Sequence, residues 1–197
     1  MTNLAETIKR IRPLDEQAMK AARLRQDNLT KPKGSLGRLE ELSVKVAGIK
    51  GQAMPSLEHK AIVTMAADHG VTAQGVSLYP REVTAQMVQN FLCGGAGINV
   101  LARQVGARVV VVDMGVATNL EPHPALICRR VACGTCDMSQ GPAMSKDQAL
   151  AAVEAGIGVL EQEVTKGLDI VGTGDMGIGN TTSASAITAA ICGASRV

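Results

Sequence analysis

Hydrophobic and polar positions change their spacing near residue 60 of this chain. Before that point, apolar residues recur every three or four positions, as on one face of a helix. After it, short apolar runs alternate with helix-like stretches, which is typical of a three-layer αβα fold with a mostly parallel sheet. We therefore expect an N-terminal helical subdomain over residues 1–55 and a Rossmann-like α/β domain over residues 56–197, with a sheet that a chain of this length leaves incomplete.

Two helices are predicted in the N-terminal subdomain. The first starts at Pro13–Asp15 and runs to about Leu29, and the Lys31–Gly37 segment then breaks the helical pattern. Ser35 is the expected N-cap of the second helix. One face of that helix needs a covering surface, from later sequence or from a second subunit, because it carries the apolar row Leu36, Leu39, Leu42, Val46 and Ile49.

Three buried strands are predicted in the α/β domain, because each run is too uniformly apolar to face water on either side. These strands are Ala61–Ala66, Val109–Asp113 and Leu168–Gly172, and a short edge strand is expected over Ile127–Val131.

Helices are expected between these strands. One begins at Pro80 and reaches about Leu92, and another follows Gly95 and reaches about Val105. A third begins after Ser145, which forms a capping-box pattern with Gln148. Its apolar residues recur in steps of three and four at Leu150, Val153, Ile157, Leu160 and Val164.

Each predicted strand ends in a polar turn that contains glycine. The first two turns are Asp68-His69-Gly70 and Asp113-Met114-Gly115, and the third is the run Gly172–Asn180. Because the carboxyl ends of parallel strands meet at one edge of a sheet, we expect the three turns to share a cleft lined by Asp68 and His69. A single aspartate is more often a turn-forming residue, so the prediction depends on all three turns together.

The run Ile170–Thr182 contains four glycines and leads into a helix that opens with Asn-Thr-Thr. Glycines bring backbone N–H groups close to a ligand, and a helix N-terminus favours an anion, most often a phosphate. The alternative is a plain turn in which the glycines serve only the bend. Asp175 within this run would repel a phosphate, so its presence indicates a ribose hydroxyl or a positively charged ring nearby.

Two common nucleotide-binding motifs do not account for this run. Gly172–Gly177 matches GxGxxG, but a dinucleotide site also needs an acidic residue about twenty positions later, and none follows Asp175. No Gly-Lys-Ser/Thr follows the glycines, which excludes a Walker loop.

Composition and charge exclude several classes of protein. A formal charge of +2, with one Tyr, one Phe and no Trp, gives no basis for binding nucleic acid. Met1–Glu6 lacks the profile of a secretory signal, and the uncharged stretches Val83–Ala102 and Met176–Ser195 are too polar to cross a bilayer. We expect a cytosolic protein with no membrane partner.

Five cysteines include one CxxC pair, Cys133 and Cys136. A structural zinc site would need a second pair of ligands, and a thioredoxin-like pair would open a helix after a strand. Incidental cysteines are favoured over a redox pair and over a zinc site, so neither a metal nor a cofactor is expected.

Four segments make the sequence similar to the nicotinate-nucleotide–dimethylbenzimidazole phosphoribosyltransferase family. They follow the family's order over nearly the whole chain: Lys31–Glu40, Ala67–Val71 with Tyr79–Met87, Gly141–Met144, and Gly174–Thr182. The resemblance implies transfer of the phosphoribosyl group of nicotinate mononucleotide to 5,6-dimethylbenzimidazole, with inversion at the anomeric carbon. The products are α-ribazole phosphate and nicotinate, in the assembly of the cobamide lower ligand. It also implies a homodimer of the full-length protein.

The resemblance also implies roles for individual residues. The substrate is bound by Gly174 and, at its phosphate, by Gly177, Gly179, Asn180 and Thr181. Asp175 stands where relatives usually have Glu, beside the ribose, where a carboxylate stabilises the positive charge of the transition state. Tyr79 and Met87 line the pocket for the incoming aromatic base.

By the same resemblance, the family's general-base glutamate lies beyond Val197, so the chain corresponds to the N-terminal portion of such an enzyme. His69 is the nearest candidate for a base by its chemistry. Three alternatives stay open: a relative that uses a phenol or another azole as acceptor, a non-catalytic binding subunit that needs further sequence or a partner, and an oxidoreductase acting through the CxxC pair.

Overall fold

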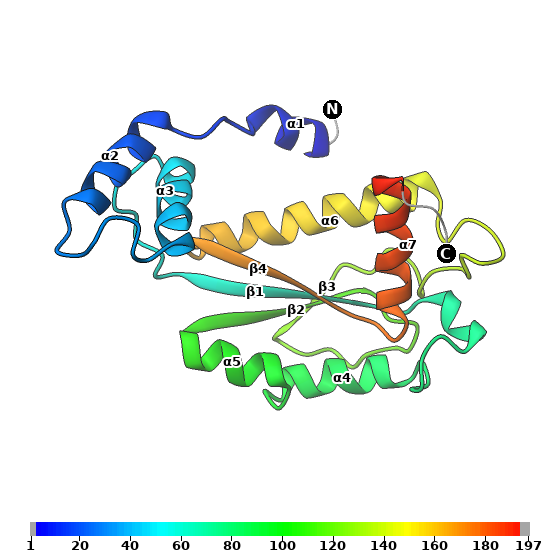
Figure 1. Cartoon of the computed structure of the whole chain (residues 1–197). Coiled ribbons are helices and arrows are strands. Elements are labelled where there is room, and N and C mark those ends of the chain that lie inside the picture. Colours follow the sequence, from blue (N-terminus) through cyan, green and yellow to red (C-terminus); the bar gives the residue numbers. More distant parts are fainter. Residues whose placement is uncertain (1–2, 194–197) are drawn as a thin grey trace. The chain divides into compact units, whose positions relative to one another are not determined.

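The computed structural model describes residues 3–193 (Figure 1). Contacts within the chain divide it into two compact units, Met1–Glu58 and His59–Val197. The first unit is helical and the second is an α/β structure. The end of the uncharged stretch Met176–Ser195, and the C-terminal Ser195–Val197, lie outside the described residues.

The N-terminal unit contains one helix more than the pattern predicts: its helices are α1 (Asn3–Arg10), α2 (Glu16–Asp27) and α3 (Arg38–Lys50). Asp15 caps α2, because its carboxylate accepts a hydrogen bond from the Ala18 amide at 2.9 Å. The predicted N-cap of α3 is wrong, since Gly37 rather than Ser35 precedes the helix. Gly34 and Gly37 adopt positive φ, and the turns they form delay the start of α3.

The face that joins α2 to α3 is not the predicted apolar row. Val44 and Ala47 of α3 are buried against Ala22 and Met19 of α2. Gly48 permits this approach, because a Cβ there would lie 2.6 Å from the Met19 Cγ. The predicted row is instead 49–66% exposed at Leu36, Leu39, Leu42 and Ile49. Small side chains form the contact because they let the helix axes approach closely.

The second unit is built on a four-stranded sheet of order β3-β2-β1-β4 with all pairs parallel. The strands are β1 (Lys60–Ala67), β2 (Ala107–Gly115), β3 (Leu126–Cys128) and β4 (Ile170–Met176). This arrangement confirms the predicted fold class, including the short edge strand near residue 127.

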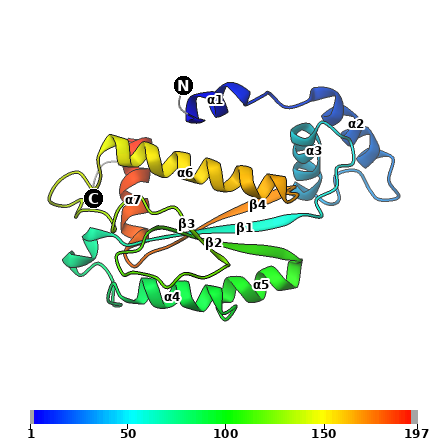
Figure 2. The same ribbon diagram turned by 180° about the vertical axis from the view of Figure 1, so that it is seen from behind.

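Helices cover both faces of this sheet (Figures 1 and 2). One face carries α4 (Val83–Leu92) and α5 (Gly97–Val105), and the other carries α6 (Lys146–Thr165). The 3-10 helix η1 (Gly70–Gln74) follows β1, and α7 (Asn180–Cys192) follows β4. Pro80 was expected in the first turn of a helix, but it lies in a separate turn before α4. The Pro80 carbonyl there accepts a hydrogen bond from the Val83 amide at 3.2 Å.

Two apolar clusters join the layers, one on each face of the sheet. Val88 and Phe91 of α4 pack with Ala66 and Val111. On the opposite face, Val159 of α6 is fully buried against Ala61, Val63, Val110 and Val112. The alternation of side chains along β1 and β2 therefore supplies both clusters, as expected for strands buried on both sides.

Strand β4 extends four residues further than predicted, to Met176 instead of Gly172. Gly172 and Gly174 therefore lie within a strand and pair with β1. A Cβ at Gly172 would lie 2.6 Å from the Ile62 Cδ1, so this glycine allows close packing inside the sheet. Of the four glycines assigned to a loop, only Gly177 and Gly179 occupy one.

The capping box of α6 is confirmed, but its buried face is not the predicted one. Ser145 and Gln148 exchange hydrogen bonds between side chain and backbone at 2.9 and 3.1 Å. Val159 and Glu163 are buried, whereas three residues of the predicted row, Val153, Leu160 and Val164, are 37–57% exposed. Gly156 lies on the sheet side, where a Cβ would be 3.3 Å from the Met65 Cε. Gly156 therefore leaves room for the Met65 side chain where α6 packs on the sheet.

Within residues 3–193, every helix is too short or too polar to cross a membrane. A cytosolic location stays a prediction.

Candidate functional site

The carboxyl ends of β1, β2 and β4 lie at one edge of the sheet, because the strands are parallel neighbours. Asp68 follows β1 directly, and Asp113 lies near the end of β2. The turn Gly177–Gly179 follows β4. The structure thus brings the three predicted polar turns to the same edge.

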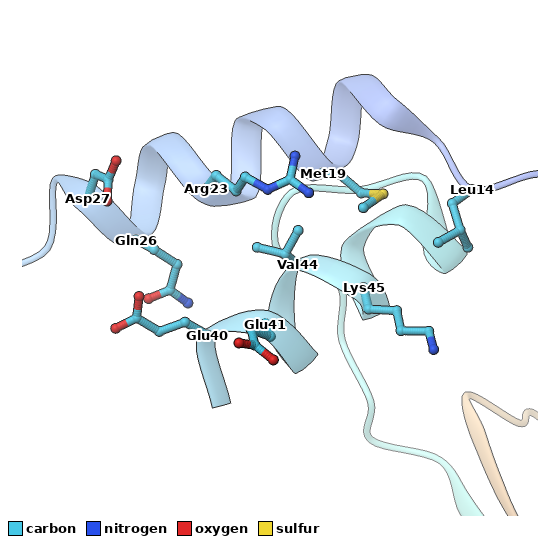
Figure 3. A pocket seen from close by; sticks show the side chains of 9 residues that line it. All are labelled: Leu14, Met19, Arg23, Gln26, Asp27, Glu40, Glu41, Val44 and Lys45. Carbon is cyan, nitrogen blue, oxygen red and sulfur yellow. The ribbon is translucent and has the colours of Figure 1, made fainter. Parts of the chain in front are cut away.

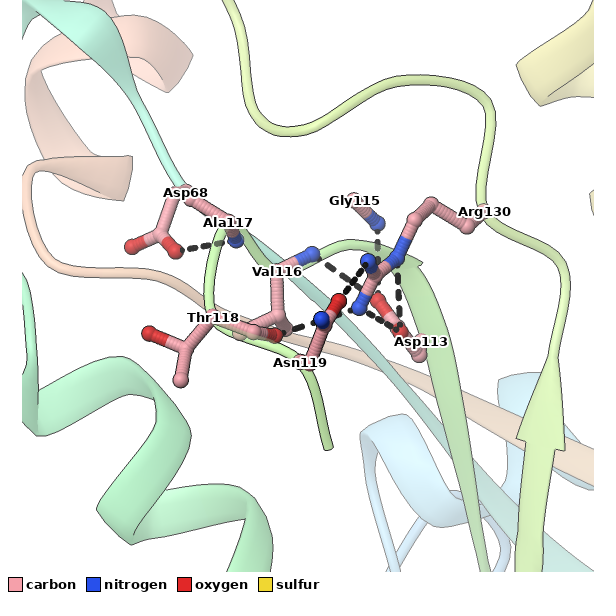
Figure 4. A network of polar contacts seen from close by, with 8 residues as sticks. All are labelled: Asp68, Asp113, Gly115, Val116, Ala117, Thr118, Asn119 and Arg130. Carbon is pink, nitrogen blue, oxygen red and sulfur yellow. Dashed lines mark hydrogen bonds and ion pairs between the residues drawn. The ribbon is translucent and has the colours of Figure 1, made fainter. Parts of the chain in front are cut away.

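Asp113 is an ion-paired anchor of the loop after β2 (Figure 4). Its carboxylate is buried, and Oδ1 accepts hydrogen bonds from the amides of Gly115 and Val116 at 3.0 and 2.8 Å. Oδ2 accepts from the Nε and Nη2 atoms of Arg130 at 3.2 and 3.0 Å, and this contact raises the pKa of Arg130. Arg130 also donates to loop residues 118 and 119. Both oxygens of Asp113 are therefore occupied by hydrogen bonds that hold the loop after β2 in place.

Asp68, directly after β1, lies at the same edge of the sheet but in a different environment. The residue is 3% exposed, and its Oδ2 accepts from the Ala117 amide at 2.7 Å. Its Oδ1 is buried and has no hydrogen-bond partner among the described residues. Figure 4 shows this oxygen pointing away from Ala117 and from Arg130. An unpaired buried carboxylate oxygen is costly, so Asp68 is suited to accept a hydrogen bond or a positive charge from a ligand.

The turn between β4 and α7 is held by close packing. A Cβ at Gly177 would clash with the Ala67 carbonyl oxygen and lie 2.8 Å from the His69 ring. The Ile178 amide donates to the Thr84 Oγ1 of α4 at 3.0 Å. Gly179 has a φ of 84° and packs on η1. Both glycines of the turn are therefore needed for its conformation, whether or not a ligand binds.

The N-terminus of α7 presents unpaired backbone donors. The Asn180 and Ser183 amides donate to carbonyls of the preceding turn at 2.9 and 3.3 Å. The amides of Thr181 and Thr182 have no acceptor among the described residues. The partial positive charge of a helix N-terminus favours an anion at such donors.

A carboxylate stands beside these donors. The Asn180 Nδ2 donates to the Asp175 Oδ2 at 2.6 Å, which ties the end of β4 to the first residue of α7. Asp175 itself is exposed. The site therefore combines donors suited to an anion with a carboxylate suited to a hydroxyl or to positive charge.

His69 lies between the end of β1 and α7. Its Nδ1 is 3.1 Å from the Ser183 Oγ. Burial lowers the pKa of His69 below its ordinary value, and the carboxylates of Asp175 and Asp68 offset this only in part. The imidazole is therefore neutral near pH 7.

The CxxC segment packs across the ends of β1 and β2. The Thr135 amide donates to the Asp68 carbonyl at 3.0 Å, and its hydroxyl accepts from the Gly70 amide at 3.1 Å. Gly134, with a φ of 82°, packs against Asp68, where a Cβ would lie 3.1 Å from the Asp68 carbonyl oxygen.

Cys133 and Cys136 are exposed and free. In the described part of the chain, no group of three or more His, Cys, Asp or Glu side chains is arranged to hold a metal ion.

A cavity of about 140 Å³ opens beside this segment, between the strand ends and the start of α6. Its lining includes Ala67, Gly115, Ala143 and Met144. The Cys136 amide donates to the Ala143 carbonyl at 2.8 Å and so holds the segment Gly141–Met144 at this edge. The structure thus brings the Ala67–Val71, Gly141–Met144 and Gly174–Thr182 segments of the family resemblance to one end of the sheet.

The two residues expected to bind the aromatic base are in different environments. Tyr79 is 66% exposed in the loop before α4. Met87 is half-buried and packs against the apolar cluster under α4. Their contact with a ring stays a prediction.

A separate cavity of about 450 Å³ lies in the N-terminal unit, between α2 and α3 (Figure 3). Its lining mixes apolar and charged side chains: Leu14, Met19, Arg23, Gln26, Asp27, Glu40, Glu41, Val44 and Lys45. None of these residues was expected in the substrate site from the sequence.

Three polar residues that support the site escape the sequence analysis. Thr84 is fully buried in the first turn of α4, Thr72 lies under Gly179, and Ser183 contacts His69. Thr84 reaches a backbone amide 94 positions away in the sequence, and Ser183 contacts a side chain 114 positions away. Such contacts leave no local pattern in a sequence.

Residues 11–197 match the family model described as phosphoribosyltransferase, and the chain belongs to this family. It is 63% identical over 193 residues to the nicotinate-nucleotide–dimethylbenzimidazole phosphoribosyltransferase of Roseiflexus sp. (strain RS-1) and 60% identical to that of Chloroflexus aggregans. Each match covers 98% of this chain and 55% of the relative. These findings confirm the family resemblance, and the chain spans about half the length of the relatives.

A solved structure shows the same fold. The crystal structure of the enzyme of this name from Thermus thermophilus superposes with a TM-score of 0.89 at 48% identity. The match covers 91% of this chain and 55% of the Thermus chain.

Proposed function

We propose that this chain carries the mononucleotide-binding part of a nicotinate-nucleotide–dimethylbenzimidazole phosphoribosyltransferase. The observation that carries the proposal is the start of α7, where Asn180 holds the Asp175 carboxylate at 2.6 Å and the Thr181 and Thr182 amides have no acceptor among the described residues. Relatives that are 60–63% identical bear the name of this enzyme. In this proposal residues 56–197 form a phosphoribosyl-binding domain, and a homodimer of the longer protein is expected.

The phosphate of nicotinate mononucleotide would sit at the N-terminus of α7. Backbone amides there can bind the phosphate without a side-chain cation, because the partial positive charge of the helix N-terminus attracts an anion. Asn180 and Thr181 add polar side chains at the same point, while the Gly177–Gly179 turn lets the ligand approach the backbone. The ribose would lie next to Asp175, the residue of β4 whose carboxylate accepts the hydrogen bond from Asn180.

The carboxylates serve the sugar and the leaving ring. Loss of nicotinate puts positive charge on the anomeric carbon, and a fixed carboxylate stabilises that charge. Asp175 is exposed at the site, and the free Oδ1 of Asp68 supplies a second negative atom from the end of β1. The proton of the incoming benzimidazole needs a separate base, which the family resemblance assigns to a glutamate beyond Val197.

Isothermal calorimetry of the 197-residue chain tests the binding step without requiring turnover. Nicotinate mononucleotide is expected to bind at least about tenfold more tightly than nicotinate riboside, which lacks the phosphate. Asn180→Asp should abolish this preference, because it places a second carboxylate beside Asp175 at the helix N-terminus. Asn28→Asp, at the end of α2, is a matched control that should bind normally.

Equal affinity for the mononucleotide and the riboside would refute the proposal. A substitution of Gly177 would not test it, because a side chain there meets the Ala67 carbonyl and the His69 ring even without ligand.

A further inference from the structure

We propose that His69 is a positioning residue that holds the first turn of α7 through Ser183. The inference deepens the proposed function, because that turn is the expected phosphate site. It assigns to His69 a role that acts through another side chain rather than on the substrate.

The two sides of the imidazole meet different parts of one turn. Nδ1 is 3.1 Å from the Ser183 Oγ, one helical turn into α7. The opposite edge of the ring, with Cδ2 and Nε2, faces Gly177, where a Cβ would lie 2.8 Å from each atom. The ring therefore fills the space between the turn and the helix, and only a glycine at position 177 leaves room for it.

The backbone of His69 is fixed in turn by η1. Its carbonyl accepts from the Thr72 amide at 3.2 Å and from the Thr72 hydroxyl at 2.8 Å. The methyl group of Thr72 lies on Gly179, where a Cβ would be 3.0 Å away. His69 and Thr72 thus support the two glycines of the turn from the β1 side.

Thr84 supports the same turn from α4, because its hydroxyl accepts from the Ile178 amide at 3.0 Å. Within residues 177–183 the side-chain hydrogen bonds from outside the segment come from Asp175, His69 and Thr84, in addition to packing by η1. Asp175 contacts Asn180 at the very start of α7, and His69 contacts Ser183, which lies one helical turn further along. A preorganised turn keeps the Thr181 and Thr182 amides directed at one point, which lowers the cost of ordering them around an anion.

Hydrogen exchange measured by mass spectrometry on the ligand-free 197-residue chain tests the positioning role directly. His69→Ala and Ser183→Ala should each speed exchange of the amides in residues 180–187 by about three- to tenfold, since each loses one net hydrogen bond. The double variant should exchange no faster than the faster single variant, because both substitutions remove the same contact.

Matched variants separate the hydrogen bond from general disruption. His69→Asn keeps a polar atom near the Nδ1 position and should stay within about twofold of the wild-type rate, whereas His69→Gln places its amide further out and should behave as His69→Ala. Ser185→Ala, on an exposed part of the same helix, should leave the rate unchanged. Thermal unfolding of each variant shows whether the chain as a whole is intact.

The inference is overturned if His69→Asn exchanges as fast as His69→Ala, or if Ser183→Ala matches Ser185→Ala. Calorimetry with nicotinate mononucleotide then connects the turn to binding: the variants with fast exchange should bind about three- to tenfold more weakly, and His69→Asn should bind normally. If the wild-type chain binds no mononucleotide, the proposed function fails, while the exchange rates still decide the role of His69.

Discussion

Asp113 and Asp68 both lie near the carboxyl ends of neighbouring parallel strands, and both are almost fully buried. Asp113 accepts hydrogen bonds on both oxygens, from two amides and from Arg130. Asp68 uses one oxygen for the Ala117 amide and leaves the other unpaired among the described residues. The difference teaches that burial alone does not identify a functional carboxylate. The partners of each oxygen separate an anchor from a candidate binding group.

The largest effect is expected for Asp113→Asn. The substitution removes the counter-ion of a mostly buried Arg130, so the free energy of unfolding should fall by about 3 kcal/mol. Urea denaturation followed by circular dichroism measures this change. A loss below about 1 kcal/mol would contradict the anchoring role.

Asp68→Asn should produce the opposite pattern. The unfolding free energy should change by less than about 1 kcal/mol, because the substitution removes a buried charge that has a single hydrogen bond. Affinity for nicotinate mononucleotide should fall about tenfold, since the proposed site loses negative charge at its free oxygen. Calorimetry and urea denaturation of the same samples give both values. Destabilisation equal to that of Asp113→Asn, with unchanged affinity, would remove the distinction between the two acids.

A third buried carboxylate extends the comparison to the other end of the sheet, with a smaller effect. Glu163 is 1% exposed and contacts Arg108 at 3.0 Å and Lys166 at 2.6 Å. Burial would raise the pKa of Glu163, but hydrogen bonds from Lys166 and Arg108 outweigh it and lower that pKa below the ordinary 4.5. Glu163→Gln should cost about 1 kcal/mol at pH 7, because both cations are partly exposed and stay hydrated.

The pH dependence follows from the lowered pKa of Glu163. A carboxyl group with a depressed folded-state pKa stabilises the protein above its unfolded pKa, and this contribution is lost as pH falls through the folded-state value. The stability gap between wild type and Glu163→Gln should therefore close below about pH 4.5. Thermal unfolding between pH 7 and pH 3 measures the gap, with Glu121→Gln, an exposed position, as control. A gap that widens on acidification would have the wrong sign.

The glycine run shows how far a sequence pattern reaches. The pattern correctly indicates a strand that leads into a helix with polar first residues. It does not show that Gly172 and Gly174 belong to the strand, because that depends on pairing with β1, more than 100 positions earlier. The two glycines look alike in sequence to Gly177 and Gly179, and only the neighbouring chain separates their roles.

Sequence by itself determined the fold class and the capping box of α6, because both depend on local patterns of residues. It also determined that the strand ends share one edge, because the carboxyl ends of parallel strands lie on the same side of a sheet. Tertiary structure decided which helix faces are buried: Gly48 lets α3 approach Met19 of α2, and α6 buries Val159 and Glu163 rather than its larger apolar row. It also decided which acid is satisfied: Arg130, 17 positions away, reaches Asp113, and the described structure offers Asp68 no such cation. Long-range contacts of this kind depend on how elements pack in three dimensions, which the spacing of residues along the chain does not encode.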